Sequence, residues 1–223
     1  MSARDAAVHS DGGSALSGPS SGSTLEIIGE FLSARGRSAA TAASLSIVSE
    51  GTNANTGLTH VRLGQQVNGL SVYGTYVKAT LNSDGELIHL IELLADPSSR
   101  VTTTSIDADD ALRAALNRNF PTYGGSLSQG AVSGNETEFS NDGFFYENPT
   151  ATKVAAPLAG GALQEAYLVV AWSDADNLLY HTLVGSGGQI LNNELRTNTD
   201  SYSIFPGRPP RDATEETANA PVH

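Results

Sequence analysis

The chain has 223 residues, of which 39% are hydrophobic, and it carries a formal net charge of −12. That length allows one large domain or two small ones, and either can bury a core. The sequence lacks the basic stripe that binds nucleic acid, and none of its apolar runs is long enough to cross a bilayer. It contains no cysteine, which excludes disulfides, thiolate catalysis and cysteine-ligated metal.

The N-terminal part predicts an irregular segment followed by a helix. Residues 1–22 are rich in Ser, Gly, Asp and Ala without periodicity, and we expect them to form a flexible leader that lacks the apolar core of a signal peptide. Ser23 and Glu26 have the spacing of a capping box, in which each side chain bonds the other residue's backbone. The helix should end near Gly36, and its apolar stripe contains Leu25, Ile28 and Leu32, widened by Ile27 and Phe31.

An antiparallel meander is predicted next, after a first strand at residues 44–50. Asn68-Gly69 lies between two alternating apolar runs, and this dipeptide is the strongest short-range hairpin signal because both turn residues need positive φ. The return strand should run from Leu70 to Leu81, and a second turn leads into a strand at residues 86–94. A helix laid across this sheet would bury the apolar faces of both.

The second half repeats the order of the first after a break at residues 96–100, which contain Pro97 and mark a domain boundary. Its helix should begin after Asp107, the expected N-cap, and should end before Pro121. Turns rich in Gly, Asn and Asp separate the strands that we expect to follow, which are residues 131–139, 144–146, 153–156, 162–172 and 177–184.

The distribution of histidines argues against catalysis by this chain. A zinc-protease helix needs His-Glu-x-x-His to place two ring nitrogens on one face, and no two of the five histidines lie within one helical turn. His60, His89 and His181 fall in predicted strands and are interpreted as hydrogen-bonded sheet residues. We therefore predict no catalytic, cofactor-binding or metal-ligating residue, no cofactor, and no enzymatic activity of the chain's own.

The segment from His60 to Gly85 also carries a family resemblance. It combines a strand beginning His-Val, a glutamine at Gln65 or Gln66, the tripeptide Val-Asn-Gly, and a strand that ends at Asp-Gly. This pattern resembles the propeptide of fungalysin-type and thermolysin-type secreted zinc metalloproteases. We expect its motif residues to be mainly structural; they are His60, Gln66, Asn68, Gly69, Val72 and Gly74.

The second half resembles PepSY, a small helix-on-sheet module that follows the first module in fungalysin-type propeptides. The matching parts are the helix start at residues 106–111 and the ending at residues 180–191. The resemblance implies an α+β fold of two cystatin-like modules in series, each with one helix packed on an antiparallel sheet. The modules would span residues 23–96 and 101–196, and residues 197–223 would form an extended tail with a candidate maturation junction.

The resemblance further implies a function. The chain would be a propeptide that acts as intramolecular chaperone and inhibitor of a cognate secreted zinc metalloprotease. Its partner would be the catalytic domain of that protease, with neither nucleic acid nor a membrane as partner, and the isolated chain would be a monomer. A freestanding secreted protease inhibitor or binding module is the alternative, and a stop codon after His223 would favour it over the propeptide.

One polar run at the end of the second module is predicted to contact the protease or to be cleaved during maturation. A segment tethered next to a catalytic domain has an effective concentration there on the order of mM. The run shows no strong helix or strand pattern after Leu195, so it is equally compatible with a plain linker. Its residues are Asn192, Asn193, Glu194, Leu195, Arg196, Thr197, Asn198, Thr199 and Asp200.

Overall fold

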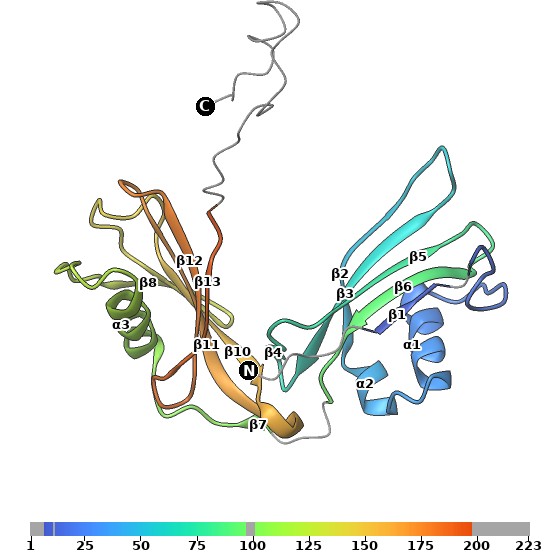
Figure 1. The fold of residues 1–223 in the computed structure, drawn as a ribbon, viewed down its shortest axis with the longest axis horizontal. Helices are drawn as coiled ribbons and strands as arrows, with labels where there is room; N and C mark the ends of the chain where they lie inside the picture. The colour runs from blue at the N-terminus through green and yellow to red at the C-terminus, as the bar shows by residue number, and fades with distance from the viewer. Residues whose placement is uncertain (1–6, 11, 97–100, 198–223) are drawn as a thin grey trace, which may run out of the picture.

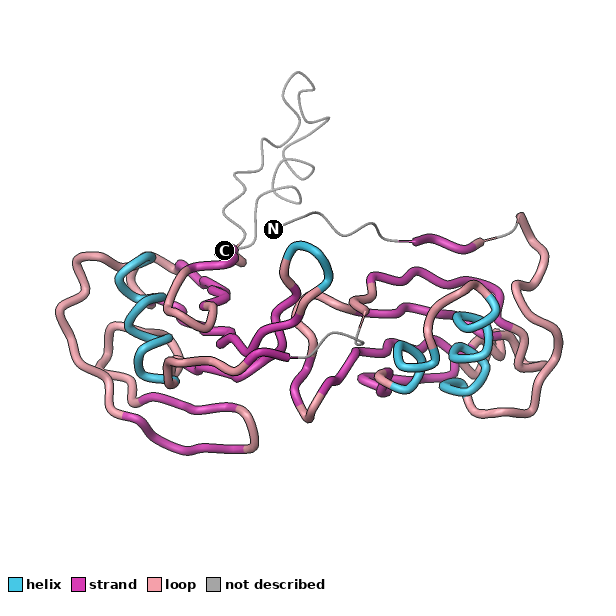
Figure 2. The backbone as a smooth tube through the Cα atoms, turned by 90° about the horizontal axis from the view of Figure 1, so that it is seen from below, coloured by secondary structure: helices cyan, strands magenta, loops and turns pink. Residues whose placement is uncertain are grey.

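The computed structural model describes residues 7–10, 12–96 and 101–197, which form two antiparallel sheets, each with a packed helix. In Figure 1 the helices lie on the two outer flanks, and the sheets lie between them. Figure 2, turned by 90°, shows the same separation of the two units along the long axis. This arrangement is the α+β class expected from the sequence. No helix in the described ranges is long and apolar enough to span a bilayer.

The first unit consists of a sheet with the strand order β1-β6-β5-β3-β2 and two helices on one of its faces. Its elements are β1 (Ala7–His9), α1 (Thr24–Ala34), α2 (Ala39–Ala43), β2 (Leu45–Thr52), β3 (Thr59–Val67), β4 (Leu70–Ser71), β5 (Tyr76–Leu81) and β6 (Leu87–Leu93). Both bonds of the predicted capping box form at Ser23 and Glu26, which fixes the start of α1. The predicted stripe is buried at Ile27, Ile28, Phe31 and Leu32 against alternate residues of β3, β5 and β6.

The predicted flexible leader is wrong for the part of residues 1–22 that the structure describes. β1 pairs with β6, placing Val8 opposite Ile91, and the backbone N–H of Leu16 donates to the Leu87 carbonyl at 2.6 Å. Ser20 is similarly held, since its N–H donates to the Asp84 carbonyl at 3.1 Å. The three residues of β1 are too few to show periodicity, and their pairing depends on the free edge of β6, which is a tertiary feature.

The second unit has the strand order β13-β12-β11-β10-β9-β8, with β7 pairing in parallel beside β11. Its elements are β7 (Val101–Thr102), α3 (Ala108–Asn119), β8 (Gln129–Ser133), β9 (Glu136–Phe139), β10 (Thr150–Pro157), a 3₁₀ turn η1 (Ala159–Gly161), β11 (Leu163–Ser173), β12 (Leu178–Val184) and β13 (Ile190–Leu195). Asp107 caps α3 as predicted, because its side chain accepts from the Asp110 N–H at 2.9 Å.

Two strand predictions in the second unit need correction. Residues 131–139 form a β8–β9 hairpin, because Gly134 takes a φ of +58° and reverses the chain. Residues 144–146 form no strand and keep only an isolated bridge between Phe145 and Ser173. Phe144 and Phe145 instead stack edge-to-face on Phe120 just after α3, at centroid distances of 5.6 and 5.8 Å. The aromatic residues suggested a strand, but in the structure their side chains pack in the core beside α3.

We expect the Asn68-Gly69 turn to limit the stability of the first unit. Both residues have positive φ, +53° and +77°, as a type I′ turn requires. Gly69→Val should lower the free energy of unfolding by about 1–3 kcal/mol, because a β-branched residue is strained there although no atom lies within 4 Å of the added Cβ. Urea midpoints would measure this loss.

Gly124→Val is the matched control for the Gly69→Val measurement. Its added Cβ also meets open space, and Gly124 does not have a positive φ. The control should leave the urea midpoint unchanged. An equal loss in both variants would show that backbone strain at the turn is not the cause.

Candidate functional site

The return strand of the motif hairpin is interrupted, contrary to the continuous strand predicted from Leu70 to Leu81. β4 ends at Ser71, and residues 72–75 leave the sheet before β5 begins at Tyr76. We call residues 72–75 the motif loop. Gly74 takes a φ of +69°, and the Thr75 hydroxyl donates to the Val72 carbonyl at 2.8 Å, so the loop closes on itself.

The motif loop docks on the second unit. Val72 forms a parallel bridge with Ala155 in β10, and the Tyr73 N–H donates to the Ala155 carbonyl at 2.9 Å. Both units contribute to the apolar cluster around this contact, whose buried members are Leu70, Val72, Val101, Ala155 and Leu163. We call this contact the junction. It joins main-chain hydrogen bonding to a buried apolar cluster, and we expect this combination to oppose independent motion of the two units.

Polar side chains surround the junction. The Tyr73 hydroxyl donates to Glu194 at 3.3 Å and accepts from the Asn192 side-chain amide at 2.9 Å. Its partial burial raises the pKa of Tyr73, so the phenol stays protonated and able to donate. On the other side of the hairpin, the Asn135 amide donates to the Gly69 carbonyl at 2.8 Å. The motif and the end of the second unit therefore meet in one place.

Each sheet has one face that no helix covers, and the junction determines where these two helix-free faces point. In Figure 1 these faces turn toward the gap between the units, with α1 and α2 behind one sheet and α3 behind the other. The face of the first sheet exposes polar and basic residues such as His60, Arg62 and Lys78. The face of the second sheet is apolar in part, with partly buried Leu168, Val170, Trp172 and Leu179. The two helix-free faces therefore differ in chemistry.

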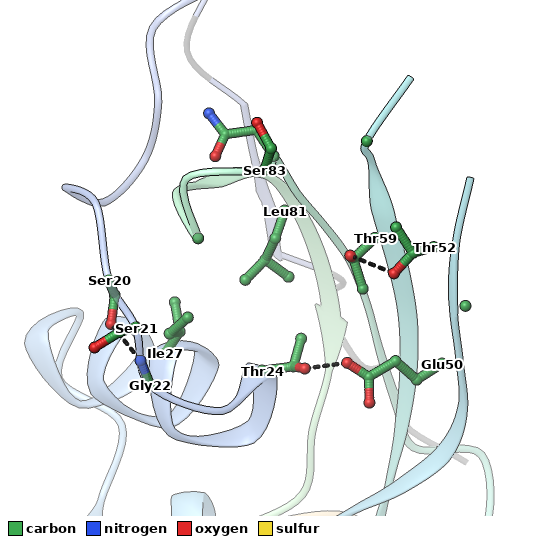
Figure 3. A pocket seen from close by; sticks show the side chains of 14 residues that line it. Ser20, Ser21, Gly22, Thr24, Ile27, Glu50, Thr52, Thr59, Leu81 and Ser83 are labelled. Carbon is green, nitrogen blue, oxygen red and sulfur yellow. Dashed lines mark hydrogen bonds between the residues drawn. The ribbon is translucent and has the colours of Figure 1, made fainter. Parts of the chain in front are cut away.

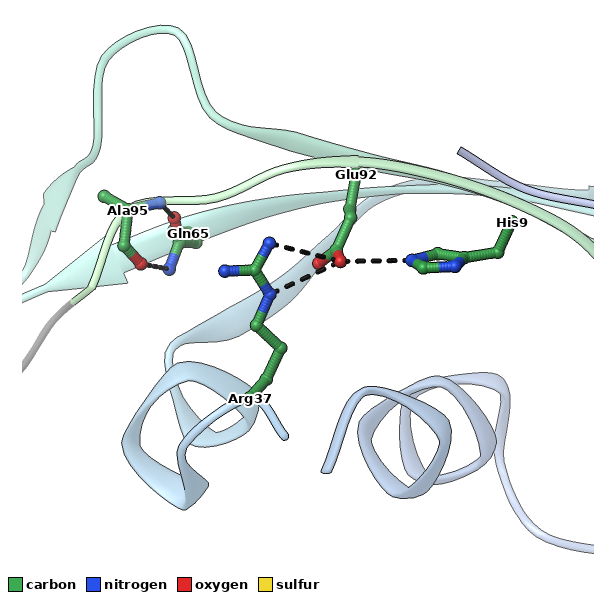
Figure 4. A network of polar contacts seen from close by, with 5 residues as sticks. All are labelled: His9, Arg37, Gln65, Glu92 and Ala95. Carbon is green, nitrogen blue, oxygen red and sulfur yellow. Dashed lines mark hydrogen bonds and ion pairs between the residues drawn. The ribbon is translucent and has the colours of Figure 1, made fainter. Parts of the chain in front are cut away.

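A buried polar network stabilises the helix-covered side of the first sheet (Figure 4). Glu92 is 2% exposed, and its Oε1 accepts from Arg37 Nη2 at 3.2 Å and lies 3.4 Å from His9 Nε2. Removing one partner of such a buried pair leaves an uncompensated charge. The network attaches β1 and the loop after α1 to β6 and holds the sheet in place, while the other carboxylate oxygen of Glu92, Oε2, is buried without a hydrogen-bond partner among the described residues.

A polar groove of about 700 Å³ lies at the far end of the first sheet (Figure 3). Hydroxyl side chains line it, including Ser20, Thr24, Thr52 and Thr59, with Ile27 and Leu81 at its base. Its carboxylate, Glu50, already accepts from the Thr24 hydroxyl. The described lining contains no histidine, lysine or cysteine, so this hydroxyl–carboxylate pair has no further basic or nucleophilic side chain beside it in the groove. Within the part of the chain that the structure describes, no three His, Cys, Asp or Glu residues form a group suited to a metal ion.

The motif residues predicted from the sequence occupy different environments. Asn68 and Gly69 form the turn, while Val72 and Gly74 belong to the motif loop at the junction. His60 is exposed in β3, where its Nδ1 lies 3.1 Å from the Thr80 hydroxyl, and Gln66 is exposed near the other end of the same strand. The structure brings the first four together in the hairpin and leaves the other two on its surface.

The buried glutamine of the motif is Gln65, whereas the motif pattern allowed either Gln65 or Gln66. Gln65 is 1% exposed, and its side-chain amide both donates to and accepts from the backbone of Ala95, at 3.0 and 2.7 Å. It thereby ties the end of β6 to β3. Strand alternation could have identified it, since Val61, Leu63 and Gln65 share the buried face.

The predicted protease-contact segment begins inside the second sheet. Asn192 to Leu195 belong to β13, which pairs with β12 on one side and forms the edge of the sheet. Arg196 and Thr197 continue along β12, and Thr197 accepts from the Leu179 N–H at 2.7 Å. Asn198, Thr199 and Asp200 lie outside the described residues, as does the rest of the predicted tail, so contact and cleavage stay predictions.

Gln65→Met should lower the free energy of unfolding by about 1–3 kcal/mol, because it leaves the partly buried N–H and carbonyl of Ala95 without their partner. Gln66→Met is the control, since Gln66 is exposed on the opposite face of the same strand. Chemical denaturation of both variants would measure the difference. A larger loss in the control would mean that Gln65 does not tie β6 to β3.

We expect His181 to make the second unit less stable in acid. Partial burial lowers the pKa of His181 below its ordinary value of 6.5, and the charge of Arg196 acts in the same direction. Below about pH 6.5 the unfolded chain takes up a proton that the folded chain resists, so stability falls as pH decreases. His181→Gln should remove this component, as unfolding free energies between pH 7.5 and 5.5 would show.

The quantity to follow is the difference in unfolding free energy between the wild type and His181→Gln at each pH. A difference for His181→Gln that stays constant over the range would contradict the assignment.

Comparisons with known proteins point to the hairpin region. The family model described as Fungalysin/Thermolysin Propeptide Motif matches residues 43–91, which is 49 of the 223 residues. No curated protein sequence matches the chain. Among solved structures, the C-terminal domain of YpeB from Bacillus megaterium is similar at 13% identity and a TM-score of 0.28, over 78% of this chain and 64% of that one. A TM-score this low does not establish a shared fold, but the propeptide motif runs from the end of α2 into β6 and contains the motif loop.

Proposed function

We propose that the chain is the pro-region of a secreted zinc metalloprotease and that it assists folding of the catalytic domain and inhibits it until cleavage. The observation that carries this proposal is the propeptide motif at residues 43–91. The matched stretch contains the central strands of the first sheet and the motif loop that joins it to the second. A motif of this kind is associated with proteins that bind a protease rather than with proteolysis itself.

The physical basis is linkage between folding and binding. A folded surface that binds the native catalytic domain, and not its unfolded chain, stabilises the native domain by mass action. The same contact inhibits the enzyme when it covers the active-site cleft of the catalytic domain. The junction supports this role, because a surface already held in one orientation loses little entropy when it binds. The two helix-free faces are the surfaces we assign to this contact.

The proposal places the chemistry in the partner. The sequence has no His-Glu-x-x-His, so the zinc ligands would come from the catalytic domain. Cleavage would then separate the pro-region from the enzyme, and we assign it to the segment Asn192–Asp200. Asn192 to Leu195 are paired with β12, so cleavage within these residues would require β13 to detach from the sheet. Sites after Thr197 are favoured because they lie beyond the described contacts with β12.

The test separates assistance in folding from simple inhibition. A fungalysin-type or thermolysin-type catalytic domain from the same organism is unfolded in denaturant and then diluted with and without the purified chain. We expect the chain to raise the yield of active protease after its later removal by proteolysis, and to inhibit the already folded enzyme. Inhibition without a gain in refolding yield would instead indicate a freestanding inhibitor.

Failure of the chain both to bind the folded domain and to improve refolding would refute the proposal. An unrelated acidic protein of similar size is the control for nonspecific effects of added protein, and it should neither inhibit the folded enzyme nor raise the refolding yield.

A further inference from the structure

Positive side chains gather on the helix-free face of the first sheet, although the whole chain is strongly acidic. Arg62 in β3 lies directly opposite Lys78 in β5, and both are exposed. In the neighbouring row, His60 lies opposite Thr80, which lies opposite His89 of β6. We call His60, Arg62, Lys78 and His89 the basic face.

No carboxylate of the described strands shares this face. The alternation of side chains places Glu92 and Glu50 on the other side of the sheet, since they lie opposite Val77 and Val61. Glu92 is occupied there by Arg37, and Glu50 by Thr24. Within the described ranges, Arg62 and Lys78 make no ion pair, and the Lys78 ammonium lies 5.4 Å from the centre of the Tyr76 ring.

The Arg62–Lys78 arrangement is unfavourable in the free protein. Like charges directly opposite on neighbouring strands destabilise a sheet. The chain has carboxylates in excess, with 24 Asp and Glu against 12 Lys and Arg, yet no carboxylate of the described residues forms an ion pair with Arg62 or Lys78. A binding partner that supplies carboxylates would relieve it. Residues kept at a cost to stability are typical of binding surfaces.

Exposed apolar residues border the basic face at both edges of the sheet. Val8 of β1, opposite Ile91, is 60% exposed, and Val48 of β2 is 62% exposed. Val48 lies over Gly64, where an added Cβ would come within 3.3 Å of its Cγ2. These valines supply contact area, which charged side chains alone do not.

From these observations we propose that the basic face is the docking surface for a carboxylate-rich patch on the catalytic domain of the partner protease. The proposal rests on the proposed function for the identity of the partner, and on charge complementarity for the chemistry of the contact. It assigns binding to the first sheet, whereas the cleavage segment lies in the second unit. Steering by opposite charges would also speed the encounter and would weaken with added salt.

Lys78→Glu tests both parts of this argument, because it should stabilise the free chain and weaken its binding to the catalytic domain. In the free chain, the variant replaces a repulsive Arg62–Lys78 pair with an attractive one, so its urea midpoint should rise above that of the wild type. In the complex, the variant sets a carboxylate against carboxylates, and binding to the catalytic domain should weaken about tenfold or more at 50 mM NaCl. At 300 mM NaCl the difference should shrink.

Arg113→Glu is the matched control. Arg113 is an exposed residue of α3, on the outer flank of the second unit, and the substitution changes the net charge by the same amount as Lys78→Glu. Binding by the control should equal that of the wild type. Surface plasmon resonance with the immobilised, zinc-loaded catalytic domain would measure all three proteins.

The outcomes distinguish this inference from the proposed function. If the wild type binds and Lys78→Glu binds as tightly, the docking surface lies elsewhere, while the pro-region assignment stands. If Arg113→Glu weakens binding as much as Lys78→Glu does, only the net charge matters and the basic face is not the contact. A wild-type chain that fails to bind refutes the proposed function, and with it the partner assigned to this face.

Discussion

The contact between Val72, Tyr73 and Ala155 is the constraint on which the arrangement of the two units depends. One backbone hydrogen bond and a parallel bridge join the first sheet to β10 of the second, and five apolar residues from both units are buried around them. Burial of a shared apolar cluster opposes independent motion of connected domains. Among the described residues, the other ties between the units are the Asn135–Gly69 hydrogen bond and the bonds of the Tyr73 hydroxyl with Asn192 and Glu194, which lie beside this contact.

The motif hairpin makes the junction available because its return strand stops early. If residues 72–75 had continued in the first sheet, Val72 would not have reached β10, and Ala155 would have lacked its bridge partner. Gly74 permits the return to the sheet at positive φ, and Asn68-Gly69 sets the register from which the loop departs. The motif is thus structural in the sense expected from the sequence, but its effect is to position one sheet relative to another. Both helix-free faces then turn toward one gap, where a single partner can contact them.

The elements that local chemistry determines were predictable from the sequence. The capping box at Ser23 and Glu26, the cap at Asp107 and the turn at Asn68-Gly69 depend on residues within a few positions of each other, and all three form as expected. The interruption after Ser71 was not predictable. The alternation of Leu70 and Val72 fits a continuing strand, and it fits equally well a loop that another unit buries. Likewise, β1 exists only because β6 offers it a free edge. The basic face required the register of three strands, which brings Arg62 beside Lys78 from 16 positions away in the chain.

The central claim is that the motif loop fixes the relative orientation of the two units. The absence of cysteine from the sequence allows a direct measurement, because spin labels can be placed at Ala34→Cys in α1 and Asn117→Cys in α3 without competing thiols. Double electron–electron resonance should give one narrow distance distribution for the labelled chain. Adding Val72→Asp, which buries a charge in the junction, should broaden it strongly, whereas Val132→Asp at an exposed position of β8 should not. A distribution that is already broad before the substitution, or one that Val72→Asp leaves narrow while circular dichroism shows both units folded, would contradict the account.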